Sequence, residues 1–214
     1  MKTLIVGGGT IDTEFALKFC KEKDFAYIIG VDAGTEFLYE NQIRPDTIVG
    51  DFDSLSPKVL SYYEEQGTLI RKFQPHKDAS DMEIAVRTAV DSGSKELYIL
   101  GGTGTRLDHV LSNIQTLAIA EKSGISSFLI DAHNRIRLLL HSVSMNKKEQ
   151  FGRYISFFPL TTVVTGVYLE GFAYPLCNHT FTSENSLGVS NEMKEEEVRI
   201  VLKEGILIMV ESKD

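Results

Sequence analysis

Several features that would assign this chain to a class of protein are scarce or absent. It has two cysteines, Cys20 and Cys177, which form no CxxC pair and no metal-ligand cluster. This spacing argues against a disulfide framework and favours buried free thiols in a reducing compartment. No run approaches the ~20 apolar residues that a bilayer span needs, and the apolar run at residues 4–6 is too short for a signal peptide. We therefore expect a soluble, cytoplasmic protein.

Basic residues are also scarce. The chain has 22 Lys and Arg against 30 Asp and Glu, a net charge of −8. An acidic chain without a basic stripe is a poor candidate for binding duplex nucleic acid or an anionic membrane. It can still bind a phosphate ligand locally, through backbone amides, a metal and a few basic side chains. Its 214 residues, 43% of them hydrophobic, are enough for one large domain or two smaller ones.

The first 130 residues alternate between short apolar runs and segments of helical periodicity. One helix start is marked by the capping box Ser80-Asp81-Met82-Glu83. Strands that alternate with helices through short turns predict a mostly parallel sheet covered on both faces. The predicted strands are residues 4–6, 27–31, 47–49, 68–72, 96–100 and 127–130, and the predicted helices are residues 15–21, 37–39, 56–66, 80–92 and 107–122.

The pattern changes near residue 134. After it come short strand-like runs punctuated by turn residues, with no helical periodicity of comparable length. These runs predict a β-sandwich. We therefore predict an α/β domain over residues 1–134 and a β-sandwich domain over residues 135–214. The predicted strands of the second domain are residues 135–141, 154–158, 162–169, 187–190, 197–203 and 207–211, and residues 147–150 are expected to form a solvated hairpin tip.

A pair of aspartates follows the predicted strand at residues 47–49, in the stretch Val49-Gly50-Asp51-Phe52-Asp53-Ser54. Side chains alternate along an extended segment, so Asp51 and Asp53 point the same way. Two adjacent carboxylates repel each other unless a cation lies between them, and hard oxygen ligands suit Mg²⁺. The alternative is a pair of solvated aspartates in a turn, where Asp is common.

A glycine-rich loop, Gly101-Gly102-Thr103-Gly104-Thr105-Arg106-Leu107-Asp108-His109, joins a predicted strand to a helix. Glycines let a backbone approach a phosphate, the helix start presents unpaired N–H groups, and Arg106 can reach phosphate oxygens. The spacing is neither that of a P-loop nor that of the dinucleotide fingerprint. A tight turn with Asp108 near a helix start is the alternative, and His109 either donates to a phosphate or packs against the helix.

The candidate loops all follow predicted strands. Ligands of α/β sheets gather at the carboxyl ends of the strands, so we expect these loops to crowd one edge. Asp78 and Asp81 belong to such a loop, although an aspartate in the first turn of a helix, like Asp81, also has a structural reason to be there. If both lie beside Asp51 and Asp53, the four carboxylates need divalent cations.

Taken together, the stretch at residues 50–54, Lys77-Asp78-Ala79-Ser80-Asp81 and the stretch at residues 101–109 resemble the thiamine pyrophosphokinase family. The order and spacing of the three motifs match, as do Asp32-Ala33-Gly34 and the segment at residues 186–192. The resemblance implies transfer of a pyrophosphoryl group from ATP to the hydroxyl of thiamine, giving thiamine diphosphate and AMP. It also implies Mg²⁺ and a homodimer, with thiamine held between the α/β domain of one subunit and the β domain of the other.

The resemblance assigns roles residue by residue. By it, the α/β domain is catalytic and binds nucleotide and metal, and the β-sandwich binds thiamine and forms the dimer. The chain has no tryptophan, so another side chain must stack on the thiamine rings. The implied metal ligands are Asp51, Asp53 and Asp81; further catalytic acids are Asp78 and Asp108; the nucleotide-binding residues are Asp32, Gly101, Gly102, Gly104, Arg106, His109 and Asn113; and the thiamine-binding residues are Ser190, Asn191, Asp53 and Asp81.

Two other functions use the same residues. A Mg²⁺-dependent phosphohydrolase needs the same carboxylates, with water as the acceptor in place of thiamine. A non-catalytic nucleotide sensor needs the phosphate loop, but it has no need to keep four carboxylates together. Release of AMP and pyrophosphate from ATP alone would indicate the phosphohydrolase. Tight ATP binding without a product from any acceptor would indicate the nucleotide sensor.

Overall fold

The computed structural model describes residues 1–53, 55–72 and 79–214. Asp78, one of the predicted catalytic acids, lies outside these residues. The chain forms two compact units, Met1–Ala132 and His133–Asp214, which differ in architecture. Among the residues described, no helix is both long and apolar enough to cross a membrane.

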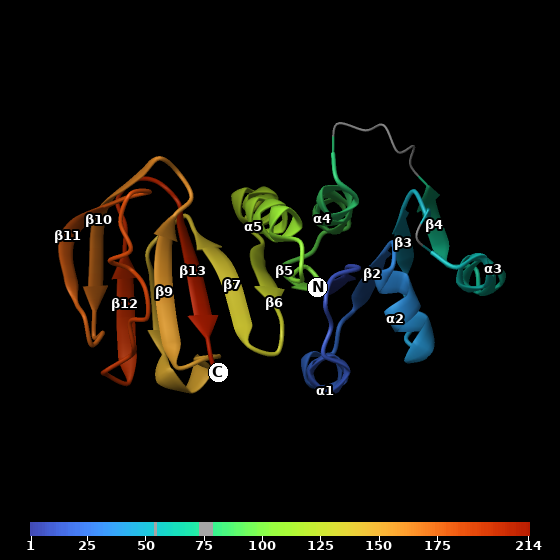
Figure 1. The fold of residues 1–214 in the computed structure, drawn as a ribbon, viewed down its shortest axis with the longest axis horizontal. Helices are drawn as coiled ribbons and strands as arrows, with labels where there is room; N and C mark the ends of the chain where they lie inside the picture. The colour runs from blue at the N-terminus through green and yellow to red at the C-terminus, as the bar shows by residue number, and fades with distance from the viewer. Residues whose placement is uncertain (54, 73–78) are drawn as a thin grey trace. The chain divides into compact units, whose positions relative to one another are not determined.

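The first unit is built on a parallel sheet (Figure 1) with the strand order β4-β3-β2-β1-β5-β6. Each pair of neighbouring strands in this order is parallel. Leu4, Ile5 and Val6 of β1 are fully buried, as expected for a strand covered on both faces. The predicted parallel α/β sheet is confirmed. Its strands are β1 (Lys2–Val6), β2 (Tyr27–Val31), β3 (Thr47–Gly50), β4 (Leu69–Lys72), β5 (Glu96–Leu100) and β6 (Ser126–Ile130).

Helices cover both faces of this sheet. Figure 1 shows α4 and α5 on one face and α1 and α2 on the other. The α4 helix begins at Ser80, whose hydroxyl accepts a hydrogen bond from the N–H of Glu83, as the capping box predicts. This cap places Asp81 in the first turn, at the carboxyl edge of the sheet. The helices are α1 (Thr13–Lys23), α2 (Gly34–Glu40), α3 (Pro57–Glu65), α4 (Asp81–Asp91) and α5 (Leu107–Lys122).

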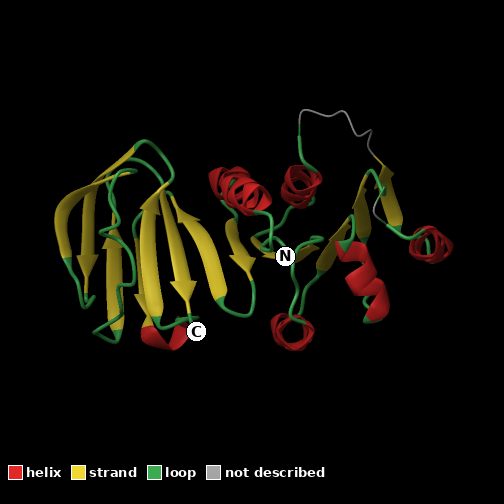
Figure 2. Cartoon of the chain, in the orientation of Figure 1, coloured by secondary structure: helices red, strands yellow, loops and turns green. Residues whose placement is uncertain are grey.

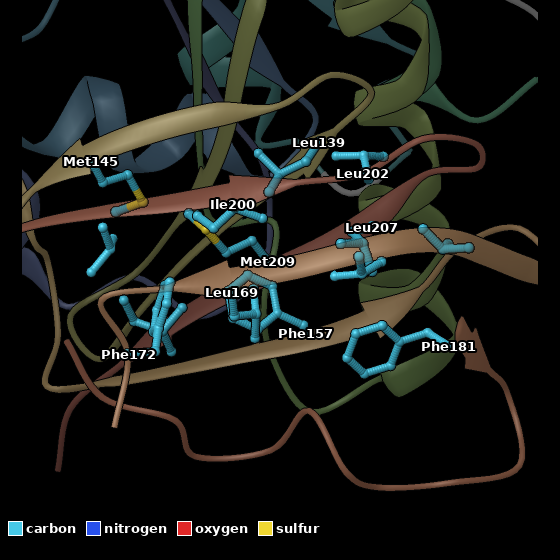
Figure 3. Close-up of a cluster of buried hydrophobic side chains, with 14 of the residues drawn as sticks. Leu139, Met145, Phe157, Leu169, Phe172, Phe181, Ile200, Leu202, Leu207 and Met209 are labelled. Carbon is cyan, nitrogen blue, oxygen red and sulfur yellow. The ribbon is translucent and has the colours of Figure 1, made fainter. Parts of the chain in front are cut away.

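The second unit consists mainly of strands (Figure 2). They form one antiparallel group in the order β7-β13-β9 and a second antiparallel sheet in the order β11-β10-β12-β8. Phe157, Leu169, Phe181, Ile200 and Met209 belong to the buried cluster between them (Figure 3). The predicted β-sandwich is confirmed. Its strands are β7 (Asn134–Leu139), β8 (Val143–Asn146), β9 (Tyr154–Pro159), β10 (Val163–Glu170), β11 (Leu176–Thr182), β12 (Glu197–Val201) and β13 (Leu207–Ser212).

Some details of the second unit were predicted wrongly. Residues 187–190 form turns instead of a strand, and Ser190 adopts a left-handed backbone with φ 56°. The strands β8 and β11 were not predicted. β8 has only four residues, and β11 is largely polar and lacks an apolar run. Residues 147–150 contain a short 3₁₀ helix, Lys147–Glu149, in place of a simple hairpin tip.

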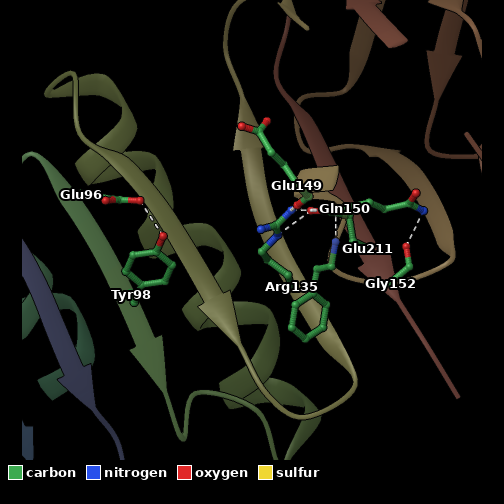
Figure 4. A network of polar contacts seen from close by, with 8 residues as sticks. Glu96, Tyr98, Arg135, Glu149, Gln150, Gly152 and Glu211 are labelled. Carbon is green, nitrogen blue, oxygen red and sulfur yellow. Dashed lines mark hydrogen bonds and ion pairs between the residues drawn. The ribbon is translucent and has the colours of Figure 1, made fainter. Parts of the chain in front are cut away.

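A buried ion pair joins β7 to β13 in the second unit (Figure 4). Glu211 is fully buried, and both of its oxygens accept hydrogen bonds from Arg135, at 2.6 and 2.8 Å. Glu211 also accepts from the N–H of Phe151, while Arg135 donates to the carbonyl of Glu149. Each charge is therefore paired and hydrogen-bonded, which is the condition for tolerating a buried ion pair. This network fixes the 3₁₀ turn against the two strands.

Candidate active site

A cavity of about 780 Å³ lies at the carboxyl edge of the parallel sheet in the first unit. Loops after β1, β2 and β5 line it, together with the first turns of α4 and α5. This is the position that the carboxyl-end rule predicts for a ligand. The predicted site residues that line it are Asp32, Asp81, Gly101, Gly102, Gly104, Arg106, Asp108, His109 and Asn113; Asp51 and Asp53 are not among the lining residues.

Two glycine loops pack directly against each other at this edge. The N–H groups of Gly7, Gly9 and Thr10 donate to the carbonyls of Leu100, Gly101 and Thr103 at 2.8 Å each. A Cβ atom on Gly9 would overlap the carbonyl oxygen of Thr103. Position 9 therefore requires glycine because two backbones approach each other closely there. The amides of the first loop are used to hold the second loop, the one that begins at Gly101.

The loop at residues 101–106 is also held from behind. The buried side chain of Asn113 on α5 donates to the carbonyl of Gly102 at 2.8 Å. The hydroxyl of Thr103 donates to Asp131, which follows β6. Sequence reasoning missed Asp131, although its place at the end of a strand is the signal that marked the other acids. These contacts preorganise the loop, which limits the entropy lost when a ligand binds.

The start of α5 brings charged groups to the cavity. Arg106 donates to both carboxylate oxygens of Asp108, at 3.2 and 2.6 Å, and both side chains are exposed. The hydrogen bond from Arg106 is the main cause that holds the pKa of the Asp108 carboxyl below its usual value. His109 is exposed and lines the cavity, so it does not pack into the core. Arg106 and His109 are therefore accessible to an anionic ligand.

Three carboxyl groups interact next to this loop. Burial raises the pKa of Asp32 from its ordinary 3.8 to about 7, and the charges of Asp81 and Asp51 raise it further toward that value. One carboxylate oxygen of Asp32, Oδ1, is buried and has no hydrogen-bond partner. A Cβ atom on Gly50 would overlap that oxygen, so glycine makes room for it. The carboxyl of Asp32 is therefore close enough to Asp51 and Asp81 for their charges to disfavour its ionised form.

Asp53 is placed differently from the other predicted acids. It is exposed, and its N–H donates to the carboxylate of Asp51 at 3.1 Å in a local turn. Between them, Phe52 has a left-handed backbone with φ 67° and a buried ring packed in a cluster with Ile48, Leu55, Val59 and Tyr63. The part of the chain that the structure describes contains no group of three His, Cys, Asp or Glu side chains already arranged to hold a metal.

The two predicted thiamine-binding residues outside the first unit lie side by side in the second. Ser190 is exposed, and its N–H donates to the hydroxyl of Ser156 at 3.0 Å. Asn191 is buried, with 5% of its surface exposed. The two neighbours thus present different faces, one to solvent and one to the interior.

The fold and the site together define a class: a two-unit protein with a cavity at the carboxyl edge of a parallel sheet, where α/β enzymes bind their ligands, and a second, all-β unit. The family model described as the catalytic domain of thiamin pyrophosphokinase matches residues 21–129. The model described as its vitamin B1 binding domain matches residues 140–207. The chain therefore belongs to the thiamine pyrophosphokinase family, as its motifs predict.

Individual relatives agree with this assignment. The thiamine pyrophosphokinase of Bacillus subtilis is 36% identical over 186 residues, which covers 87% of each chain. The crystal structure of the enzyme from that species has a TM-score of 0.87 at 34% identity and covers 100% of both chains. The thiamin pyrophosphokinase of Geobacillus thermodenitrificans gives a TM-score of 0.86 at 31% identity, over 100% of this chain and 98% of the other. The prediction that this chain is a diphosphotransferase is confirmed by its family.

Proposed function

We propose that the protein transfers a pyrophosphoryl group from ATP to the hydroxyl of thiamine, with Mg²⁺ bound at its acids, as a cytoplasmic homodimer. The cavity at the carboxyl edge of the parallel sheet carries this proposal. It combines a glycine loop held in place from behind, an accessible arginine and histidine, and a group of acids. Such a combination suits a charged triphosphate with its counter-cation.

The triphosphate lies along the loop at residues 101–106 and the start of α5. Gly101, Gly102 and Gly104 allow the backbone to approach the phosphates, and the first turn of α5 supplies unpaired N–H groups. Arg106 leaves Asp108 to bind phosphate oxygens with its planar fork. His109 donates to the same oxygens, and Asn113 acts from behind by holding the carbonyl of Gly102.

The acids at this edge fit a divalent cation. Burial is the main cause that raises the pKa of Asp32, and the negative charges of Asp81 and Asp51 raise it further; a cation removes that repulsion. The Oδ1 of Asp32, next to Gly50, is buried without a hydrogen-bond partner. In the proposal, Asp51, Asp53 and Asp81 hold Mg²⁺, which when bound neutralises charge on the phosphate oxygens.

Positioning and charge stabilisation account for the rate in this proposal. The thiamine hydroxyl attacks the β-phosphorus and its proton passes to solvent, the bond between the β-phosphorus and the oxygen of the α-phosphate breaks, and AMP leaves with that oxygen. Charge on the transferred group is stabilised by Arg106 and by the loop amides, which are in place before the reaction. Asp108, which pairs with Arg106 before the nucleotide binds, is a further catalytic acid. Asp78, which lies outside the described residues, takes the same role by the resemblance of its motif.

In the proposed homodimer, thiamine is bound by the β-sandwich of one subunit together with the acids of the α/β unit of the other. Its thiazolium ring is a permanent cation, which Asp53 and Asp81 attract. Ser190 presents an exposed hydroxyl, and Asn191 lies next to it. With no tryptophan in the chain, Tyr174 is the aromatic side chain that we place against the thiamine rings, because 69% of its surface is exposed and its backbone contacts Asn191.

Mass detection of thiamine diphosphate tests the proposal. The protein is mixed with ATP, Mg²⁺ and thiamine, and parallel samples omit one component each. Product that requires all three components is the expected result. Steady release of AMP and pyrophosphate without thiamine identifies a phosphohydrolase, and tight ATP binding without any product identifies a nucleotide sensor; either result overturns the proposal.

A further inference from the structure

The segment at residues 188–195 joins two parts of the β-sandwich. On one side it pairs with β9: the N–H of Phe157 donates to the carbonyl of Gly188, and Ile155 and Asn191 exchange two backbone hydrogen bonds of 2.7 and 3.0 Å. On the other side it pairs with residues 171–174, where the N–H of Ala173 donates to the carbonyl of Glu192. Both edges of the segment are therefore fixed by backbone hydrogen bonds.

The side-chain amide of Asn191 is used almost completely inside the protein. Its Oδ1 accepts from the N–H of Tyr174 at 3.0 Å and from the N–H of Glu192 at 2.9 Å. Its Nδ2 donates to the carbonyl of Tyr174 at 2.8 Å. An amide oxygen has two lone pairs, so this oxygen is saturated. With 5% of its surface exposed, Asn191 has little left to offer a substrate.

Tyr174 has the opposite character. Its ring is exposed, while its backbone N–H and carbonyl are both held by the same amide. Pro175 follows, and the residue before a proline has few backbone conformations. A fixed backbone sets the direction of the Cα–Cβ bond and limits the rotamers that the two side-chain torsions can adopt. The position of this ring therefore depends on Asn191.

We propose that Asn191 is a positioning residue for thiamine binding, which acts through Tyr174 and does not touch the substrate. The inference rests on the proposed function, since it assigns Tyr174 to thiamine. It differs from the simplest interpretation of the Ser190-Asn191 pair, in which both side chains contact thiamine. Ser190 keeps that role in this account, and Asn191 supports the tyrosine that we place against the thiamine rings.

A double-mutant cycle separates positioning from direct contact. Asn191→Asp keeps the size and the acceptor but replaces the donor to the carbonyl of Tyr174 with a second acceptor. We expect it to raise KM for thiamine roughly five- to thirtyfold, with kcat and KM for ATP within about twofold. In a Tyr174→Ala background, which removes the ring, the same change should have an effect of less than about twofold.

Two outcomes of the double-mutant cycle would contradict the positioning role of Asn191. An equal rise in both backgrounds means that Asn191 touches thiamine, and no rise in either means that it does not matter; both overturn the proposal. Asn185→Asp is the matched control, since Asn185 is exposed in the same connection between β11 and β12. Asn191→Ser serves as a second variant if the aspartate variant does not fold. A wild type that makes no thiamine diphosphate refutes the proposed function instead.

A spectroscopic measurement tests the positioning itself, apart from activity. Because the chain has no tryptophan, Tyr174→Trp creates a single reporter at this position. Adding Asn191→Asp should lower the fluorescence anisotropy of this reporter and increase its quenching by acrylamide. The Asn185→Asp control should change neither. Unchanged anisotropy and quenching in the Asn191 variant contradict the proposal.

Discussion

At the scale of single residues, Asp32 shows how the acids of the site influence one another. Its pKa of about 7 means that the folded chain holds a proton there which the unfolded chain, with a pKa of 3.8, has released. The free energy of unfolding of the metal-free protein should therefore fall as the pH rises from about 4 to about 7. Asp32→Asn should flatten this dependence, as measured by urea unfolding in a chelator. Identical pH profiles for the two proteins contradict the account.

Asp51 is the residue whose loss should separate catalysis from folding. Asp51→Asn removes one of the charges expected to hold the cation, so kcat should fall by ~100-fold or more. The unfolding midpoint should stay close to that of the wild type, because the half-buried Asp51 keeps its shape in the variant and its Oδ1 can still accept from the N–H of Asp53. Asp91→Asn, at an exposed position on α4, is the control and should retain full activity. Wild-type turnover in Asp51→Asn refutes the metal role.

Arg106 should distinguish the two substrates. Its guanidinium is exposed at the cavity and pairs with Asp108 in the structure, so it is available to exchange that partner for a phosphate. Arg106→Ala should raise the Kd for ATP about tenfold or more and leave the Kd for thiamine nearly unchanged. Calorimetric titrations with each ligand measure this. Arg87→Ala removes an exposed arginine from α4 as a control, and equal losses for both ligands in Arg106→Ala contradict the placement.

At the scale of elements, the two glycine loops form one unit. Gly9→Ala places a methyl group against the carbonyl of Thr103, which should cost ~1–3 kcal/mol of stability and weaken ATP binding. ATP binding weakens because the added methyl group pushes away the loop at residues 101–106, which is the loop proposed to bind the triphosphate. Gly67→Asn is the control: Gly67 has open space around it, and Asn tolerates its φ of 71° better than other residues that carry a side chain. Similar unfolding curves and affinities for the two variants contradict this account.

Most of the α/β unit could be predicted from the sequence because its signals are local. Apolar runs of β-branched residues gave the strands, Ser80 gave the start of α4, and the carboxyl-end rule gathered the candidate loops. The raised pKa of Asp32 could not be predicted, since it depends first on burial and then on the charges of Asp81 and Asp51, which are distant in the chain.

In the second unit, the strand predicted over residues 187–190 was wrong for a related reason, because distant parts of the chain decide the backbone there. Leu187 and Val189 suggested a strand, but the backbone turns there, and the bonds that hold it come from β9 and from Tyr174. The use of Asn191 as an internal support has no local signature. Such roles become visible only when the partners are brought together by the fold.

At the scale of the whole molecule, the proposed homodimer has a functional consequence. If each site combines the first unit of one subunit with the second unit of its partner, two inactive variants can complement each other. Asp51→Asn and Ser190→Trp disable different units, so unfolding, mixing and refolding them together should restore about a quarter of the wild-type activity in a two-fold symmetric dimer. The variants refolded separately are the control. Activity no greater than theirs contradicts a shared site.

The stoichiometry of the products tests the central claim most directly. Phosphorus NMR of a reaction with ATP, Mg²⁺ and thiamine counts every phosphorylated species at once. Transfer of an intact pyrophosphoryl group predicts one AMP for each thiamine diphosphate, with no ADP and no thiamine monophosphate. Accumulation of ADP with thiamine monophosphate, or of AMP with free pyrophosphate, would contradict it.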